Sequence, residues 1–330
     1  MTGERFRHSL AVLLILWVVL LSPCASIAQE AEVSGVVTEI RLGRGTVELR
    51  SPGDLKWRQV GPLLTLRAGD TVQATEDASA VMLLTGRLGT IKVEAANSPF
   101  VVPRSPGEQS KIQKSLTLLG ESLKHLWQSV VEHPRAPLAT RGDPGAPVIV
   151  TPRNSLLLPG PFTIEWRGSD LVRYALTLSG PDGVVLERMH LAGFSFDYPR
   201  DGPPLLPGVR YSVRVRSARH VSEEAPFEVA NPTLARAIAQ ALAHLETEFA
   251  NVTSSNTLTV IRAAFLAQNG FTHDARLAVL ATLKKDSEEP TLYFLLGYLY
   301  ARAGLSELAD EAFSESSLLI RPPATYQHSR

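Results

Sequence analysis

Four polar residues that lie within eight positions are the first candidates for chemistry in this sequence. Asp70, Thr75, Glu76 and Asp77 flank the run "TVQA". Two carboxylates that converge in space can act together as acid and base or nucleophile, as in the cleavage of glycosidic bonds. These residues, however, follow Gly or cluster in "TEDAS" between stretches that alternate apolar and polar residues, which is typical of turns between strands. The spacing therefore favours turn residues over a catalytic pair.

Other catalytic arrangements are missing from the sequence. The eight histidines are dispersed and do not form the His-Glu-x-x-His pattern of zinc proteases. There is no Gly-x-Ser-x-Gly elbow and no phosphate-binding loop. Glu223 and Glu224 are adjacent, so on a strand they point to opposite faces. We therefore predict that the chain is not an enzyme, with no catalytic residues, no metal ligands and no cofactor.

Charge and length limit the function classes further. The chain has 330 residues, 33 of them basic and 33 acidic, and a formal net charge of zero. A balanced charge does not favour binding to nucleic acid or to an anionic membrane surface. The length exceeds that of one ordinary domain and predicts two or three.

Residues 1–28 are typical of an export signal. Arg5 and Arg7 precede the apolar run "LAVLLILWVVLL", and "SPCASIA" ends in small residues that suit a signal peptidase. Cleavage would leave a mature chain without cysteine, because Cys24 is the only one. We expect an exported protein that is stabilised without disulfides.

Two alternatives for this segment stay open. Residues 9–28 carry no charge, so the segment could remain as an uncleaved membrane anchor. Lipidation at Cys24 is disfavoured, because Pro23 stands where lipoprotein signals carry a small residue.

Residues 31–104 alternate apolar and polar residues almost throughout, which predicts a small all-β domain. Val47 and Leu49 should face one side of a strand. The turn carboxylates should flank strands that bury four apolar side chains: Leu66, Val72, Val81 and Leu83.

This region resembles the FecR-type domain of bacterial envelope proteins. The resemblance rests on "SGVVTEIRLGRGTVEL", "KWRQVGPLLTLRAGDTV" and "ATEDASAVMLLTG". One departure is Thr85-Gly86-Arg87, where the family commonly has an Asp-Gly turn. The resemblance implies protein recognition in the periplasm and, in its namesake members, control of a sigma factor. That control needs a cytoplasmic segment, and only about eight residues precede the apolar run here.

Residues 105–146 predict an amphipathic helix followed by a Pro/Gly linker. Between residues 110 and 133, apolar residues recur at steps of three or four, and Pro134 ends the pattern. We expect this helix to cover the open face of a neighbouring domain, with a partner or a membrane surface as alternatives. We assign no function to the "RGD" tripeptide in the linker.

Residues 147–230 return to a period of two and predict a β-sandwich. The run "GPDG" predicts a hairpin turn, with Asp-Gly favoured where both central residues need positive φ. The runs "PVIVTPRNSLLLPGPFTIEWRG", "YALTLSGPDGVVLER" and "LLPGVRYSVRVRS" are similar to bacterial fibronectin type III or immunoglobulin-like modules. Trp166 and Tyr211 should be core residues of this sandwich.

Residues 231–323 predict helices, followed by a tail at 324–330. Small and aromatic residues align at an offset of 34 residues, for example Gly270 with Gly304. The run "LYFLLGYLYARAGLSELADEAFSESSLLIRP" resembles a tetratricopeptide repeat. The resemblance implies a peptide-binding groove, whose candidate residues are Asn256, Arg262, Tyr298 and Arg302.

The sequence thus predicts a multidomain protein: a small all-β FecR-like domain, an all-β immunoglobulin-like sandwich and an all-α tetratricopeptide-like C-terminal region. We expect a non-catalytic scaffold or adaptor of the periplasm or cell envelope. Its partners would be envelope proteins, through a peptide or glycan ligand, and not nucleic acid. The alternative is a FecR-like signalling regulator that senses an outer-membrane receptor and is anchored in the inner membrane by an uncleaved N-terminus.

Overall fold

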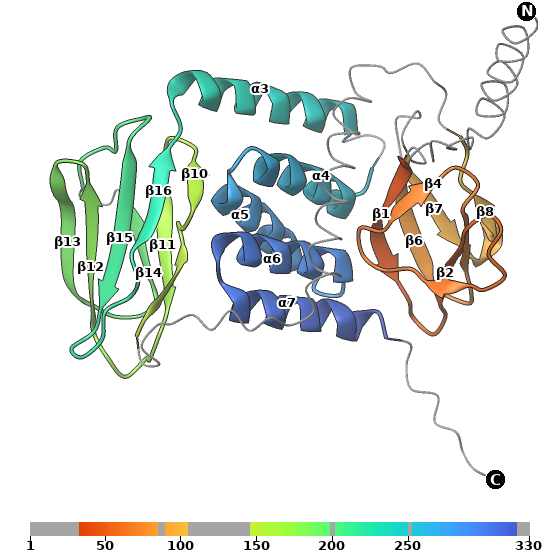
Figure 1. Ribbon diagram of the computed structural model, residues 1–330, viewed down its shortest axis with the longest axis horizontal. Coiled ribbons are helices and arrows are strands. Elements are labelled where there is room, and N and C mark those ends of the chain that lie inside the picture. Colours follow the sequence, from red (N-terminus) through yellow and green to blue (C-terminus); the bar gives the residue numbers. More distant parts are fainter. Residues whose placement is uncertain (1–32, 85–89, 105–145, 199–201, 250–252, 322–330) are drawn as a thin grey trace, which may run out of the picture. The chain divides into compact units, whose positions relative to one another are not determined.

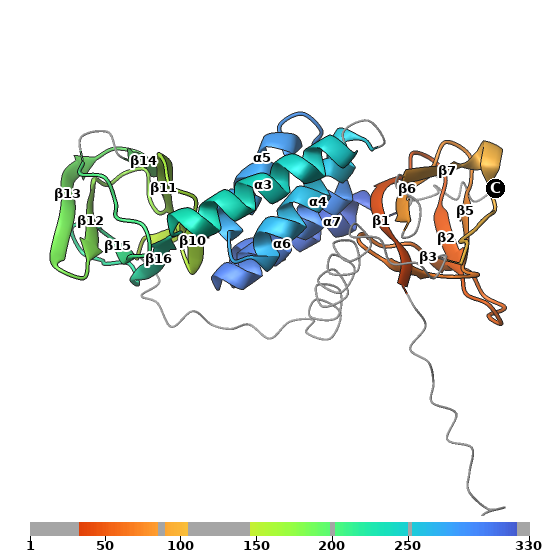
Figure 2. The ribbon, with the colours of Figure 1, turned by 90° about the horizontal axis from the view of Figure 1, so that it is seen from above.

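The computed structural model describes residues 33–84, 90–104, 146–198, 202–249 and 253–321 (Figures 1 and 2). Four predictions lie outside these residues: the signal peptide, the Thr85-Gly86-Arg87 departure, the amphipathic helix after residue 104 and the C-terminal tail. They stay predictions.

The first β region consists of two antiparallel four-stranded sheets. One sheet has the order β4-β1-β6-β7, formed by β4 (Thr65–Arg67), β1 (Val33–Arg41), β6 (Ser79–Leu84) and β7 (Thr90–Glu94). The other has the order β3-β2-β5-β8, formed by β3 (Arg58–Gln59), β2 (Val47–Arg50), β5 (Thr71–Ala74) and β8 (Phe100–Val101). A short 3₁₀ turn (Ala95–Asn97) follows β7.

Alternation along the strands places the core of this region as expected, with one exception. Val47 and Leu49 are fully buried, so their predicted common face is confirmed. Val81 was expected in the core but is only half-buried, while Met82 beside it is fully buried. Strand β6 is buried on both faces, because Met82 joins the core between the two sheets and Leu83 joins the core of the helices.

The second β region also has two sheets. The larger has the order β10-β16-β15-β12-β13, formed by β10 (Ser155–Leu157), β16 (Ala225–Val229), β15 (Arg210–Arg216), β12 (Tyr174–Gly180) and β13 (Gly183–Leu191), with β10 parallel to β16. The smaller has the order β14-β11-β9, formed by β14 (Ser195–Tyr198), β11 (Phe162–Arg167) and β9 (Val148–Thr151).

Aromatic side chains fill the core of this second region. Trp166 and Tyr211 are both buried, as predicted. Trp166 meets Tyr174 edge to face at 5.7 Å between ring centroids, and Tyr211 stacks on Phe227 at 5.8 Å. The Trp166–Tyr174 contact joins the two sheets, because Trp166 lies on β11 and Tyr174 on β12, whereas Tyr211 and Phe227 both lie on the larger sheet.

The hairpin at residues 180–183 forms, but its backbone differs from the expectation. Gly180 pairs with Gly183, so Pro181 and Asp182 are the central residues. Only Gly183 of this turn has a positive φ, at 116°. The Pro181 ring holds φ near −65°, and this excludes a turn that needs positive φ at both central residues.

Five helices follow the strands: α3 (Pro232–Phe249), α4 (Ser255–Gln268), α5 (Thr272–Leu283), α6 (Pro290–Ala303) and α7 (Ser306–Leu319). Helices α4 to α7 are stacked side by side in chain order (Figure 1). Gly297 allows α6 and α7 to approach closely, because a Cβ at this position would lie 2.6 Å from the ring of Phe313.

The structure overturns the predicted fold class. The described residues form β-sheets in the first two-thirds of the chain and five helices at the C-terminal end, without a clear all-α tetratricopeptide-like region.

The described residues from Val33 onward belong to one compact unit. The hydrophobic core of the helices includes side chains from both β regions: Val36, Leu63, Leu83, Val150 and the partly buried Leu156 and Leu158. The helices are therefore not self-contained, since strands complete their core.

Candidate functional site

The acidic residues that opened the sequence analysis are turn residues in the structure. Asp70 is 2 % exposed, and its Oδ2 accepts the Arg67 N–H at 2.8 Å across the turn between β4 and β5. Asp77 accepts the Arg44 N–H at 2.6 Å through Oδ1, and this hydrogen bond lowers the pKa of its carboxyl group. The turn interpretation is confirmed for both residues.

The four predicted groove residues lie in three separate environments. Asn256 of α4 is buried and donates a hydrogen bond to Asp286 at 2.8 Å. Arg262 pairs with Glu246 of α3 at 2.8 Å. Tyr298 and Arg302 come together on α6, at 3.3 Å between Nη1 and the hydroxyl oxygen. The structure thus brings two of the four together, and their role in peptide binding stays a prediction.

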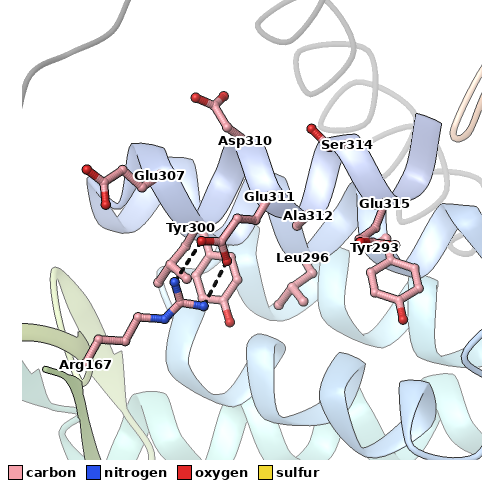
Figure 3. Close-up of a pocket in the computed structure, with 11 residues that line it drawn as sticks. Arg167, Tyr293, Leu296, Tyr300, Glu307, Asp310, Glu311, Ala312, Ser314 and Glu315 are labelled. Atoms are coloured by element: carbon pink, nitrogen blue, oxygen red, sulfur yellow. Dashed lines mark hydrogen bonds and ion pairs between the residues drawn. The ribbon is translucent and has the colours of Figure 1, made fainter. Parts of the chain in front are cut away.

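A hollow elsewhere among the described residues is a candidate site. It lies along α6 and α7, has a volume of about 840 Å³, and we call it the α6–α7 groove (Figure 3). Its lining consists of Arg167 from β11, Tyr293, Leu296 and Tyr300 from α6, and Glu307, Leu308, Asp310, Glu311, Ala312, Ser314 and Glu315 from α7.

The local sequence explains how the two helices form this groove. Glu289 caps α6 by accepting the Thr291 N–H, and Pro290 stands in the first turn, where its missing N–H has no cost. Gly304 ends α6 with a φ of 78°, which a glycine adopts without strain. Helix α7 begins at Ser306, so the short connection makes the two helices antiparallel neighbours.

One face of each helix lines the groove. Tyr293, Leu296 and Tyr300 follow at steps of three and four residues, which places them on one stripe of α6. On α7, Glu307, Glu311 and Glu315 follow at steps of four residues and form a stripe of carboxylates. The groove therefore has an apolar wall on one helix and an acidic wall on the other.

Arg167 reaches the groove from β11 and binds its acidic wall. Its two terminal nitrogens donate to the two carboxylate oxygens of Glu311 at 2.9 and 2.8 Å (Figure 3). This hydrogen-bonded pair lowers the pKa of Glu311 and raises that of Arg167. Both side chains are more than half exposed, so the pair contributes at most about 1 kcal/mol to stability.

A second, buried arginine supports the groove from behind Tyr300. Arg276 of α5 is 8 % exposed and lies over the Tyr300 ring, 5.7 Å from its centroid. It also donates to Glu165 of β11 at 2.6 Å. Glu165 and Arg167 are two residues apart, so they share the face of β11 opposite the buried Trp166. This strand therefore holds one end of the groove through two Arg–Glu pairs.

The lining of the groove is acidic. It has four carboxylates and one guanidinium, a formal net charge of −3, and no histidine. Among the described residues, no three His, Asp or Glu side chains are placed to hold a metal ion. The chemistry that this arrangement offers is binding of a positively charged group.

A buried polar cluster joins β1 to the N-termini of α4 and α6. Glu39 of β1 accepts hydrogen bonds from Ser254 and, at 2.6 Å, from the Thr257 hydroxyl at the start of α4. Ile40 donates its N–H to Glu289 Oε1 at 3.2 Å. Carboxylates at helix N-termini are stabilised by the free N–H groups there. This cluster attaches a strand to two helices.

Glu289 has a strongly shifted pKa within this cluster. The side chain is 0 % exposed, and its Oε2 has no hydrogen-bond partner, with Arg41 Nε 3.7 Å away. Burial raises the pKa of Glu289 to about 7, against the opposite effect of its hydrogen bonds and of Arg41.

Two more buried titratable groups lie at the start of α5. The His273 Nδ1 lies 2.5 Å from the Thr151 hydroxyl of β9, and burial lowers the pKa of this histidine to about 4. Burial raises the pKa of Asp274 to about 6. His273 is therefore neutral at pH 7 and serves the contact between α5 and β9.

Comparison with known proteins leaves the chain without an assigned family. No protein-family model matches it. No curated protein matches either. Among solved structures, a biofilm-associated protein BSP domain is 11 % identical, with a TM-score of 0.19, over 57 % of this chain and 25 % of that one. A beta-1,2-glucanase from Parabacteroides distasonis is 9 % identical, with a TM-score of 0.21, over 87 % of this chain and 49 % of that one. The chain thus spans a quarter and about half of these two structures, and such low scores carry no argument about fold or function.

Among the described residues, no helix is both long and apolar enough to span a bilayer.

Sequence reasoning missed the acidic wall of the groove and Arg167. The sequence nevertheless contained a pattern that indicates each of them. Glu165 and Arg167 are charged residues on alternate positions around a core tryptophan, and the glutamates of α7 repeat every four residues. Only the fold places these two signals side by side.

Proposed function

We propose that this protein is a non-catalytic, exported scaffold or adaptor of the cell envelope that binds a partner protein through the α6–α7 groove. The observation that carries the proposal is the groove itself, with tyrosines and leucine on one wall and four carboxylates on the other. Among the described residues, only one of these carboxylates, Glu311, has an ion-pair partner. Pockets that recognise ligands typically combine an apolar surface with a few placed polar groups. The export signal and the resemblance of residues 34–86 to a periplasmic recognition domain support the location and the class of partner.

Crosslinking in living cells tests this function. A photo-crosslinking amino acid at the exposed Ser314 should trap one exported protein in the source organism. The same amino acid at Leu277, which is exposed on α5 outside the groove, is the matched control. A product that appears at Ser314, is absent at Leu277 and is lost on Glu307→Lys/Glu315→Lys supports the proposal. Equal or no products at the two positions contradict it.

The second candidate function is a membrane-anchored signalling regulator that senses an outer-membrane receptor. The observation that favours it is the uncharged stretch of residues 9–28 ahead of the FecR-like region. Determining the N-terminus of the native protein separates the two. A mature start near Gln29 supports the exported scaffold, and an intact Met1 in the membrane fraction supports the regulator.

A further inference from the structure

We propose that the α6–α7 groove recognises a basic segment of its partner, an extended stretch in which lysine or arginine flanks an aliphatic or aromatic residue. This inference rests on the proposed binding function and specifies the chemistry of the ligand. Three features of the groove carry it: its apolar wall, its uncompensated charge and its length.

The apolar wall is firm, and its accessible part is the half-buried Tyr293, whereas Leu296 and Tyr300 are only 6 % and 9 % exposed. Tyr300 is held between α7 and the buried Arg276, which lies over its ring. Leu296 lies between the two tyrosines on the same stripe of α6 (Figure 3). Aromatic rings in fixed positions offer a large contact area at little entropic cost, so they suit an aliphatic or aromatic side chain of a partner.

The negative charge of the groove favours a positively charged ligand. Arg167 is already bound by both oxygens of Glu311, so it offers no free cation to an anionic ligand. Glu307, Asp310 and Glu315 are exposed, and each offers a carboxylate at the rim. The groove would repel phosphate-bearing ligands such as nucleic acid or anionic lipid. A basic peptide, in contrast, could form an ion pair with each of these carboxylates.

The length of the groove sets the size of the segment. Tyr293 and Tyr300 are seven residues apart on α6, about 10 Å at roughly 1.5 Å per residue. An extended peptide rises about 3.3 Å per residue, so three to four residues cover this distance. A short segment that alternates basic and apolar residues can therefore place its apolar side chains on the tyrosine wall and its charges at the rim.

A labelled peptide tests the chemistry directly. The probe is a fluorescein-labelled Lys-Leu-Lys-Tyr-Lys-Leu-Lys peptide, titrated with the mature chain and followed by fluorescence anisotropy. We expect saturable binding that weakens about fivefold, equivalent to roughly 1 kcal/mol, in the variant Glu307→Gln/Asp310→Asn/Glu315→Gln. The variant Asp54→Asn/Asp170→Asn/Asp182→Asn removes the same charge at exposed positions outside the groove and should bind as the wild type does.

Two further measurements locate the peptide and test its apolar part. In methyl NMR spectra, the peptide should shift the signals of Leu296 and Leu308, which line the groove, and leave those of the exposed Leu55 and Leu206, which do not line it, unchanged. Tyr293→Ala should weaken binding, and Tyr293→Phe should restore it. Equal loss in the two charge variants, shifts away from the groove, or displacement by spermidine as effective as by unlabelled peptide would overturn the proposal.

The outcome separates the ligand chemistry from the function. If the Ser314 crosslink forms with a partner but the basic peptide fails to bind, the function stands and the proposed ligand is wrong. If the crosslink and the peptide both fail, the proposed function is wrong as well.

Discussion

Single residues of this protein show how burial changes the role of a carboxylate. Asp77 at an exposed turn has a lowered pKa, because a backbone N–H stabilises its charged form. Glu289 accepts two N–H groups as well, yet its pKa is raised, because the side chain is fully buried. Desolvation outweighs hydrogen bonding when no water reaches the charge.

The raised pKa of Glu289 predicts a pH-dependent stability. The unfolded carboxyl group has a pKa of 4.5 and the folded one about 7, so the folded state binds more protons between these values. The contribution of Glu289 to stability is therefore fully present below about pH 4.5 and is lost as pH rises through 7. In urea unfolding, the free energy of unfolding of the wild type should fall between pH 5 and pH 8. We expect Glu289→Gln to remove on the order of 2 kcal/mol of this fall.

The comparison with the variant isolates Glu289 from other groups. Asp274 acts in the same direction as Glu289, and the lowered pKa of His273 acts in the opposite direction, but both are unchanged in the variant. Identical pH profiles for wild type and Glu289→Gln would contradict the assignment.

Elements of the structure are joined by polar contacts of unequal strength. Strand β11 meets the helices through Arg276–Glu165 and Arg167–Glu311. The first pair includes a buried guanidinium, whereas the second is exposed. Removing one partner of a buried pair leaves the other charge without compensation, and removing an exposed pair leaves both groups in water.

We therefore predict different costs for two similar substitutions. Arg276→Gln should lower the free energy of unfolding by about 3 kcal/mol, and Arg167→Gln by less than about 1 kcal/mol. Urea denaturation of the two variants measures both values under the same conditions. Equal costs would show that the burial of Arg276 does not decide the strength of its pair.

The packing of α6 against α7 gives a further prediction. Gly297→Ala places a Cβ 2.6 Å from the Phe313 ring, so the helices must separate or the ring must move. We expect a loss of about 1–3 kcal/mol in the free energy of unfolding. Phe313→Leu should reduce that loss when combined with Gly297→Ala, because the smaller side chain leaves room for the methyl group. An additive double variant would contradict the contact as the cause.

The whole described chain shares its hydrophobic core. Side chains of β1, β6, β9 and β10 enter the core of the helices, and polar contacts join β1 to α4 and α6. A helical segment cut from these strands would lose the buried side chains of Val36, Leu83 and Val150 from its core. Its stability depends on residues that lie far away in the sequence.

This shared core predicts that residues 232–323 alone do not form a cooperatively folded domain. Thermal unfolding followed by circular dichroism should show a broad, weak transition for this fragment and a sharp transition for the mature chain. A sharp transition of the fragment, with native-like dispersion in its NMR spectrum, would support a self-contained helical domain instead.

Much of the local structure was determined by the sequence alone. Alternation predicted the common face of Val47 and Leu49, the turn positions of Asp70 and Asp77, and the core positions of Trp166 and Tyr211. These features depend on neighbours within a few positions, so a periodic pattern records them. Val81 was misplaced, because a strand buried on both faces has no clear alternation to indicate which side chain is exposed.

Only the tertiary structure decided how these parts meet. The α6–α7 groove needs Arg167 of β11 beside Glu311, 144 positions later, and the burial of Glu289 needs Ile40 from the first strand. A charged residue occupies the same place in the apolar-polar alternation whether its side chain faces water or a distant element. Periodicity therefore did not distinguish a solvent-facing glutamate from a buried one. For the same reason the helical segment was predicted to be an all-α tetratricopeptide-like region, although strands from both β regions complete its core.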